Sequence, residues 1–133
     1  MVEVYFDGAS AGNPGLSGAG VFINYKNGQV ERFSIPLGEM SNHEAEFRAF
    51  IIALRLCLEK GLKSVSFRTD SKLIDDAVEN GFLKREPFAT FYQEAEDYMR
   101  QFDLFFMKWI PSRQNKNADE LAKLAIRKNV INS

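Results

Sequence analysis

The sequence contains one cysteine, one histidine and no excess of either charge. Its 17 Lys and Arg side chains face 18 Asp and Glu, for a formal net charge of −1, so the chain lacks the broad basic field that drives non-specific binding to nucleic acid. A single cysteine excludes an internal disulfide and fits a reducing compartment. No apolar run approaches the length of a membrane span, and no signal peptide opens the chain. We therefore expect a cytoplasmic protein without membrane contact.

The length and composition are those of one globular domain. The chain has 133 residues, 45% of them hydrophobic, which is enough to bury most of its apolar surface in a single core. We expect one domain spanning residues 1–133. Nothing in the sequence demands a dimer, which favours a monomer.

The hydrophobic periodicity predicts an α/β fold. Three strands come first, followed by a helix, a strand, two helices, a strand and a last helix. A meander followed by crossover connections implies a mixed five-stranded sheet, with three antiparallel strands, parallel crossovers and helices on both faces. The apolar run that contains Trp109 is interpreted as sheet core, not as a base-stacking surface. The expected strands cover residues 2–7, 18–25, 29–37, 64–69 and 104–110, and the expected helices cover 41–60, 71–80, 88–101 and a final stretch ending near 128.

Two of the predicted strands end in a carboxylate. Asp7 follows the first strand and precedes a glycine-rich turn at 12–15, and Asp70 follows the fourth strand. Ligands of mixed sheets bind outside the carboxyl ends of the strands. If these two strands are neighbours, both carboxylates lie at one site.

The long helix adds a third candidate. At about 100° per residue, Glu46 falls in the row of Phe50 and Cys57 and points inward, where a carboxylate needs a metal ion or hydrogen-bonding partners. Glu44 has a sufficient role in a capping box with Ser41, and Cys57 is interpreted as a small core residue. His43 either approaches the site beside Glu46 or is an ordinary surface histidine.

Asp119 completes the set in the first turn of the last helix. Compensation of the helix dipole is an alternative role for it. Four gathered carboxylates without adjacent cations would repel one another unless divalent ions occupied the site, and hard oxygen ligands suit Mg²⁺ or Mn²⁺. Two such ions can activate water and stabilise the leaving oxygen of a phosphodiester. The acidic side chains at 75, 76 and 79 are interpreted as solvated surface charge.

Four motifs, in order, resemble the ribonuclease H type 1 family over nearly the whole chain. They are Asp7-Gly-Ala-Ser with the glycine-rich turn, Asn42-His-Glu-Ala-Glu-Phe-Arg-Ala, Thr69-Asp-Ser, and Asn115-Lys-Asn-Ala-Asp-Glu-Leu-Ala. The resemblance implies a short form without a hybrid-binding domain that cuts the RNA strand of an RNA/DNA hybrid, leaving 3′-hydroxyl and 5′-phosphate ends. It also implies that Asp7, Glu46, Asp70 and Asp119 bind two metal ions.

The resemblance further implies a set of substrate contacts, in which 2′-hydroxyl recognition selects RNA. These candidates are Ser10, Asn13, Asn42, His43, Ser71, Arg113 and Asn115. The chain departs from the family in two ways. The loop before Asp119 offers Arg113 in place of a mobile histidine, and the basic helical protrusion of some members is reduced to residues 84–85. We therefore expect weak affinity for substrate and a steep salt dependence.

Two other functions stay open at this point. One is a non-catalytic or weakly active module that binds RNA or RNA/DNA hybrid, although a pure binder gains nothing from an anionic cluster facing phosphates. The other is a different nuclease or a transferase of the same fold, such as a resolvase, an exonuclease or a transposase-like activity.

Overall fold

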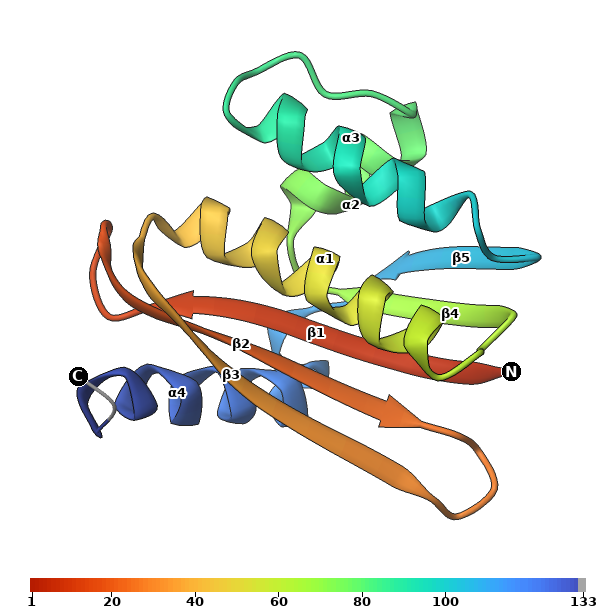
Figure 1. Cartoon of the computed structure of the whole chain (residues 1–133), viewed down its shortest axis with the longest axis horizontal. Helices are drawn as coiled ribbons and strands as arrows, with labels where there is room; N and C mark the ends of the chain where they lie inside the picture. The colour runs from red at the N-terminus through yellow and green to blue at the C-terminus, as the bar shows by residue number, and fades with distance from the viewer. Residues whose placement is uncertain (132–133) are drawn as a thin grey trace.

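The computed structural model describes residues 1–131 and contains the predicted elements in the predicted order (Figure 1). The strands are β1 (Val2–Ser10), β2 (Gly15–Asn24), β3 (Val30–Met40), β4 (Ser64–Thr69) and β5 (Leu104–Trp109). The helices are α1 (Asn42–Glu59), α2 (Lys72–Asn80), α3 (Phe88–Met99) and α4 (Lys116–Ile131), with a short 3₁₀ turn η1 (Ser112–Gln114) before α4.

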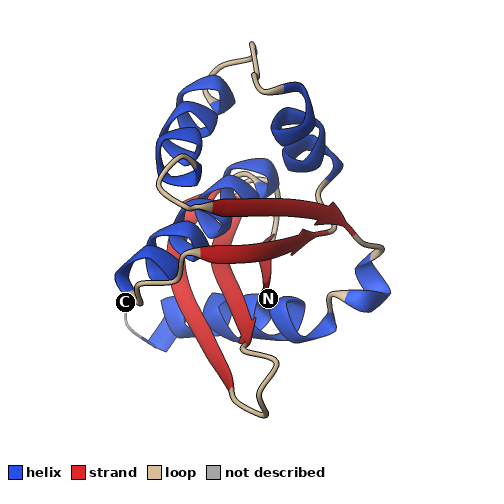
Figure 2. Cartoon of the chain, turned by 90° about the vertical axis from the view of Figure 1, so that its right-hand side faces the viewer, coloured by secondary structure: helices blue, strands red, loops and turns tan. Residues whose placement is uncertain are grey.

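The five strands form one mixed sheet in the order β3-β2-β1-β4-β5. The first three strands pair antiparallel, whereas β1 with β4 and β4 with β5 pair parallel. Helix α1 lies on one face, with α2 and α3 beyond it, and α4 lies on the other face (Figures 1 and 2). The predicted fold, with β1 and β4 as neighbours, is thereby confirmed.

Two glycines allow the helices to approach the sheet closely. A Cβ atom on Gly8 would lie 2.1 Å from the Ala45 carbonyl oxygen of α1, and one on Gly20 would lie 2.1 Å from the Ala118 carbonyl oxygen of α4. Strand β1 continues through Gly8, which pairs with Ala19 of β2 and packs closely against α1 instead of starting a turn. The expected end of the strand at Asp7 was wrong, since Asp7 lies inside β1, although it comes after the last β1/β4 pair.

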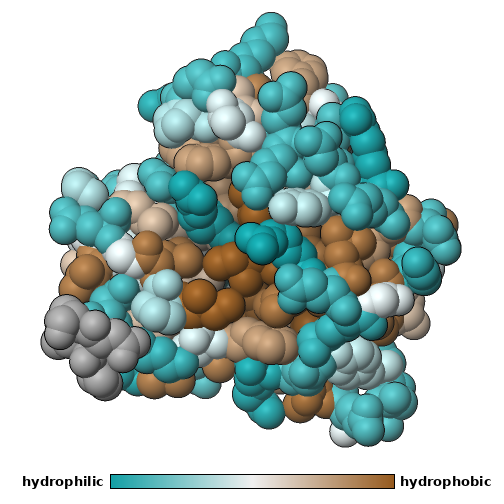
Figure 3. Space-filling model, in the orientation of Figure 1, coloured by the Kyte–Doolittle hydropathy of each residue, from teal (hydrophilic) through white to brown (hydrophobic). Residues whose placement is uncertain are grey.

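Phenylalanine side chains fill the core between the sheet and α1. The rings of Phe6 and Phe50 stack with centroids 5.0 Å apart, and Phe67 packs against both. Figure 3 shows that apolar surface also reaches the outside below α1, where Ile35 and Leu56 line a shallow hollow. None of the helices within residues 1–131 is long and apolar enough to cross a membrane.

The expectation that the β5 run is wholly core was half wrong. Phe105 and Met107 pack against the core, but Leu104, Phe106 and Trp109 are 49%, 52% and 40% exposed. Strand β5 lies at the sheet edge. Its side chains alternate between the faces, so Leu104 and Phe106 lie on the face opposite α1. Trp109 shares the face of Phe105 and Met107 and is exposed at the end of the strand, where Lys72 Nζ lies 5.6 Å from its ring centroid.

Candidate active site

Four elements bring the four predicted carboxylates together at one end of the sheet. Asp7 is in β1, Glu46 is in the second turn of α1, Asp70 follows β4 and Asp119 is in the first turn of α4. The carboxyl group of Asp7 interacts electrostatically with all three of the others. The predicted cluster is therefore present.

Asp7 occupies the centre of this cluster. Burial and the nearby charge of Asp70 raise its pKa from 3.8 to about 9, with further contributions from Asp119 and Glu46. Hydrogen bonding with the Asp119 carboxyl also contributes to the raised pKa of Asp7. Without a cation the site therefore favours a protonated Asp7 at neutral pH, which is the expected behaviour of gathered carboxylates in a poorly solvated position.

Glu46 is held by neighbours at the start of α1 and α2. Asn42 donates a hydrogen bond to Glu46 Oε1 at 3.2 Å, and His43 Nδ1 lies 3.8 Å from Glu46 Oε2. Burial raises the pKa of Glu46, and a hydrogen bond from Ser71 together with His43 opposes this effect. His43 therefore lies beside Glu46 while its side chain is 56% exposed, so both predicted descriptions apply to it.

Asp70 and Asn115 link β4, β1 and α4. Burial raises the pKa of Asp70, and hydrogen bonds from Asn115 and Ser112 oppose that rise. The Asn115 side chain is 1% exposed and donates to the Phe6 carbonyl oxygen at 3.0 Å, while its own Oδ1 has no partner. Asn115 thus fastens the strand that carries Asp7 to the segment that leads into Asp119.

Asp119 makes an ion pair inside its own helix. Lys123 Nζ lies 2.9 Å from Asp119 Oδ2, one turn further along α4. This lysine was missed from the sequence, although its i,i+4 spacing from Asp119 was visible there. One of the four carboxylates is therefore paired with a cation of its own helix.

The remaining predicted contact residues differ in how exposed they are. Asn13 and Asn42 are exposed and joined, since Asn13 Oδ1 accepts from the Asn42 backbone N–H at 3.0 Å. Ser10 is half-buried and hydrogen-bonds to Ser17 at 2.7 Å. Arg113 is exposed on η1. Ser71 is 6% exposed and caps α2.

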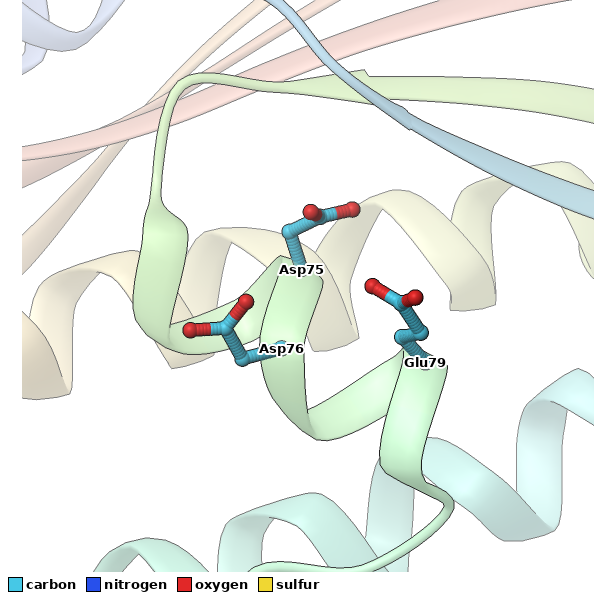
Figure 4. Close-up of side chains that lie close together, drawn as sticks. All are labelled: Asp75, Asp76 and Glu79. Atoms are coloured by element: carbon cyan, nitrogen blue, oxygen red, sulfur yellow. The ribbon is translucent and has the colours of Figure 1, made fainter.

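A second acidic group lies on α2. The carboxylates of Asp75, Asp76 and Glu79 bring three ligand oxygens within 4.8 Å of one another (Figure 4). Among residues 1–131 no other three acidic, histidine or cysteine side chains do so, and this includes the four carboxylates of the candidate active site. Asp76 and Glu79 are exposed, and Lys72 pairs with Asp76 at 3.6 Å. Asp76 and Glu79 fit the predicted solvated charge, whereas Asp75 is half-buried and burial raises its pKa.

Nearly the whole chain is similar to known proteins. Residues 5–125 match the family described as reverse transcriptase-like. The protein EbsB of Enterococcus faecalis is 35% identical over 96% of both chains. The Ribonuclease HI of Halobacterium salinarum is 31% identical over 94% of this chain, which spans 64% of that protein's length.

Solved structures agree with these sequence matches. The RNase H1 of Halobacterium salinarum superposes with a TM-score of 0.89 at 29% identity, over 96% of this chain and 98% of the other. LC11-RNase H1 in complex with an RNA/DNA hybrid superposes with a TM-score of 0.88 at 31% identity, over 98% and 99% of the two chains. The resemblance expected from the four motifs is confirmed, and the chain belongs to the reverse transcriptase-like family, among the domains that share the type 1 ribonuclease H fold.

Proposed function

We propose that this protein is a metal-dependent endonuclease that hydrolyses the RNA strand of RNA/DNA hybrids. The observation that carries the proposal is the gathering of four carboxylates from β1, α1, the end of β4 and α4 at one end of the sheet. Relatives named Ribonuclease HI, and an RNase H1 solved with an RNA/DNA hybrid, support the same substrate.

The residues present fit a pair of divalent cations, Mg²⁺ or Mn²⁺. Asp7, Glu46, Asp70 and Asp119 offer hard oxygen ligands. Burial together with mutual repulsion raises the pKa of Asp7 to about 9, so positive charge is what the cluster lacks. Bound ions would supply activation of a water molecule and charge stabilisation of the scissile phosphate.

The surrounding side chains would position the hybrid. Asn13 and Asn42 form an exposed pair beside Glu46, where they can meet sugar and phosphate groups of the RNA strand. Ser10 ends β1, His43 is in the first turn of α1 beside Glu46, and Arg113 is on η1, which precedes the helix that carries Asp119. Contacts with 2′-hydroxyls would select RNA over DNA, and cleavage would leave 3′-hydroxyl and 5′-phosphate ends.

Three further points belong to this proposal. We propose that residues 1–133 act as one domain, because one sheet and one core unite the described elements. We also propose that the protein works in the cytoplasm, and as a monomer.

A panel of labelled substrates tests the proposed activity against its rivals. The wild-type protein should cut an RNA/DNA hybrid in Mg²⁺ or Mn²⁺ and leave duplex DNA, single-stranded RNA and branched DNA intact. If the protein instead prefers to cut branched or duplex DNA, it is a different nuclease of this fold. Binding of hybrid that is unchanged by EDTA, without any cleavage, would indicate a binding module.

A further inference from the structure

Helix α4 covers only part of its face of the sheet. It packs on β2 at Gly18 and Gly20, near the carboxylate site, and the strands extend beyond it toward the β2–β3 hairpin (Figure 1). On this uncovered part, one cross-strand row joins all five strands in register. The row is Arg32, Phe22, Tyr5, Arg68 and Lys108, from β3 to β5. We call this row, with the neighbouring Phe106, the open sheet face.

Aromatic rings and guanidinium groups are packed together along this row. The Tyr5 and Phe22 rings meet edge to face with centroids 6.0 Å apart. The Arg32 guanidinium lies 5.3 Å from the Phe22 centroid, and the Arg68 guanidinium lies 5.9 Å from the Tyr5 centroid. The cations are thereby held in place above the sheet instead of extending freely into solvent.

The charge on the open sheet face is mainly positive. Lys26 at the hairpin adds a cation to the three in the row, and the carboxylate of Glu3 pairs with Lys26 and Arg68. Asp7, two residues after Tyr5 on the same side of β1, borders the face. Glu3 is occupied, since its Oε2 lies 3.2 Å from Arg68 and 3.6 Å from Lys26. A chain with a formal charge of −1 therefore presents a local cationic surface.

The β5 end of the face is exposed and apolar. Phe106 is 52% exposed beside the exposed Lys108, and it lies at an edge strand. Of the three rings on this face, Phe106 is the exposed one, since Phe22 is 8% exposed and Tyr5 is half-buried. An exposed aromatic ring beside cations on a sheet is a feature with which proteins bind single-stranded nucleic acid, because an unpaired base stacks on the ring while the cations meet the phosphates.

We propose that the open sheet face binds single-stranded nucleic acid, RNA or DNA, as a site separate from the carboxylate cluster. A duplex fits less well, because its bases expose no ring faces to Phe106. An acidic protein segment would use the cations but not the exposed Phe106 ring. Tyr5 and Arg68 lie two residues before Asp7 and Asp70, so a bound strand would run close to the carboxylate site. The inference does not depend on the proposed hydrolysis.

Fluorescence anisotropy with labelled oligo-U and oligo-dT of about 12 nucleotides tests this binding. The full chain is measured in EDTA, so that metal-dependent cleavage cannot occur. Lys108→Glu and Phe106→Ala are the test variants, since both side chains are exposed and their loss leaves the core intact. Arg100→Glu is the matched control, because Arg100 is 70% exposed and pairs with Glu96 on the α3 side of the molecule.

We expect Lys108→Glu to weaken binding about tenfold at low salt and to lower the salt slope by about 0.7. Phe106→Ala should weaken binding at least about fivefold, which is the effect of losing one stacked base, with the salt slope unchanged. Arg100→Glu should stay within about twofold of wild type. Circular dichroism and melting curves establish that each variant is folded.

Several outcomes would overturn the inference. The inference is wrong if the wild-type protein binds neither oligonucleotide or prefers a duplex. It is also wrong if Lys108→Glu, Phe106→Ala and Arg100→Glu lose affinity equally. Binding of a poly-glutamate peptide that depends on Lys108, without oligonucleotide binding, would assign the face to an acidic protein partner instead. The protein could also bind oligonucleotides through Lys108 and Phe106 and yet fail to cut an RNA/DNA hybrid. That result would support binding at the open sheet face and refute the proposed hydrolysis.

Discussion

Replacing Asp7 by Asn should make the metal-free protein more stable at neutral pH. Folding raises the pKa of this carboxyl group above its value in the unfolded chain. Below the unfolded pKa its contribution to stability is fully present, and that contribution is lost as the pH rises toward the pKa of the folded state. For Asp7 the window runs from 3.8 to about 9. At about 1.36 kcal/mol per pH unit, the cost at pH 7 is at most about 4 kcal/mol. The other carboxylates share this repulsion, so we expect Asp7→Asn to recover about 2 kcal/mol.

Urea unfolding in EDTA between pH 4 and pH 9 measures this effect. Wild type should lose stability as the pH rises, and Asp7→Asn should lose less, with the two curves meeting near pH 4. Asp97→Asn is the control, because this exposed carboxylate on α3 lies far along the chain from the cluster. If Asp7→Asn is destabilised at pH 7, or follows the wild-type pH dependence, the reasoning about a self-repelling cluster is refuted.

Three further substitutions test other parts of the account. Gly20→Ala should cost about 3 kcal/mol in urea unfolding, because its Cβ would lie 2.1 Å from the Ala118 carbonyl oxygen; an unchanged midpoint would contradict the close packing of α4. Asn115→Ala should cost about 1–3 kcal/mol through loss of its buried hydrogen bond to β1 and should also lower hybrid cleavage, whereas a neutral effect on both would exclude the fastening role. Lys123→Met should lower the Mg²⁺ concentration that gives half of the maximal thermal stabilisation about two- to fivefold. The reason is that Asp119, which pairs with Lys123 at 2.9 Å in the wild type, is then free to bind the ion. An unchanged or higher Mg²⁺ concentration would show that the ion pair does not compete with Mg²⁺ for Asp119.

The order of the elements and the identity of the carboxylate cluster could be predicted from local signals. Alternation of apolar residues defined the strands, and the helical period placed Glu46 on the inner side of α1. The parallel pairing of β1 with β4 follows from the crossover between them, and it brings Asp7 near Asp70. These inferences needed only spacing along the chain.

The details that failed depend on contacts between distant segments. Gly8 looked like the exit from β1, but it is a packing position against α1, which no local pattern reveals. The exposure of Phe106 depends on how far α4 covers the sheet. Asn115 stays a predicted substrate contact, but the sequence did not reveal that its buried side chain donates to a carbonyl 109 residues away. Local polarity cannot distinguish an exposed amide from one that fastens two elements.

The most direct test of the central claim is cleavage of an end-labelled RNA strand annealed to DNA. The assay uses low salt, Mg²⁺ and Mn²⁺ in turn, and Asp70→Asn beside wild type, with Asp76→Asn as a control from the exposed acidic group on α2. We predict internal cuts confined to the RNA strand, lost in Asp70→Asn and retained in Asp76→Asn. Two results would contradict the assignment of the carboxylate cluster as a ribonuclease H active site. One is a folded wild-type protein that makes no metal-dependent cut, and the other is an Asp70→Asn variant that cuts as well as the wild type.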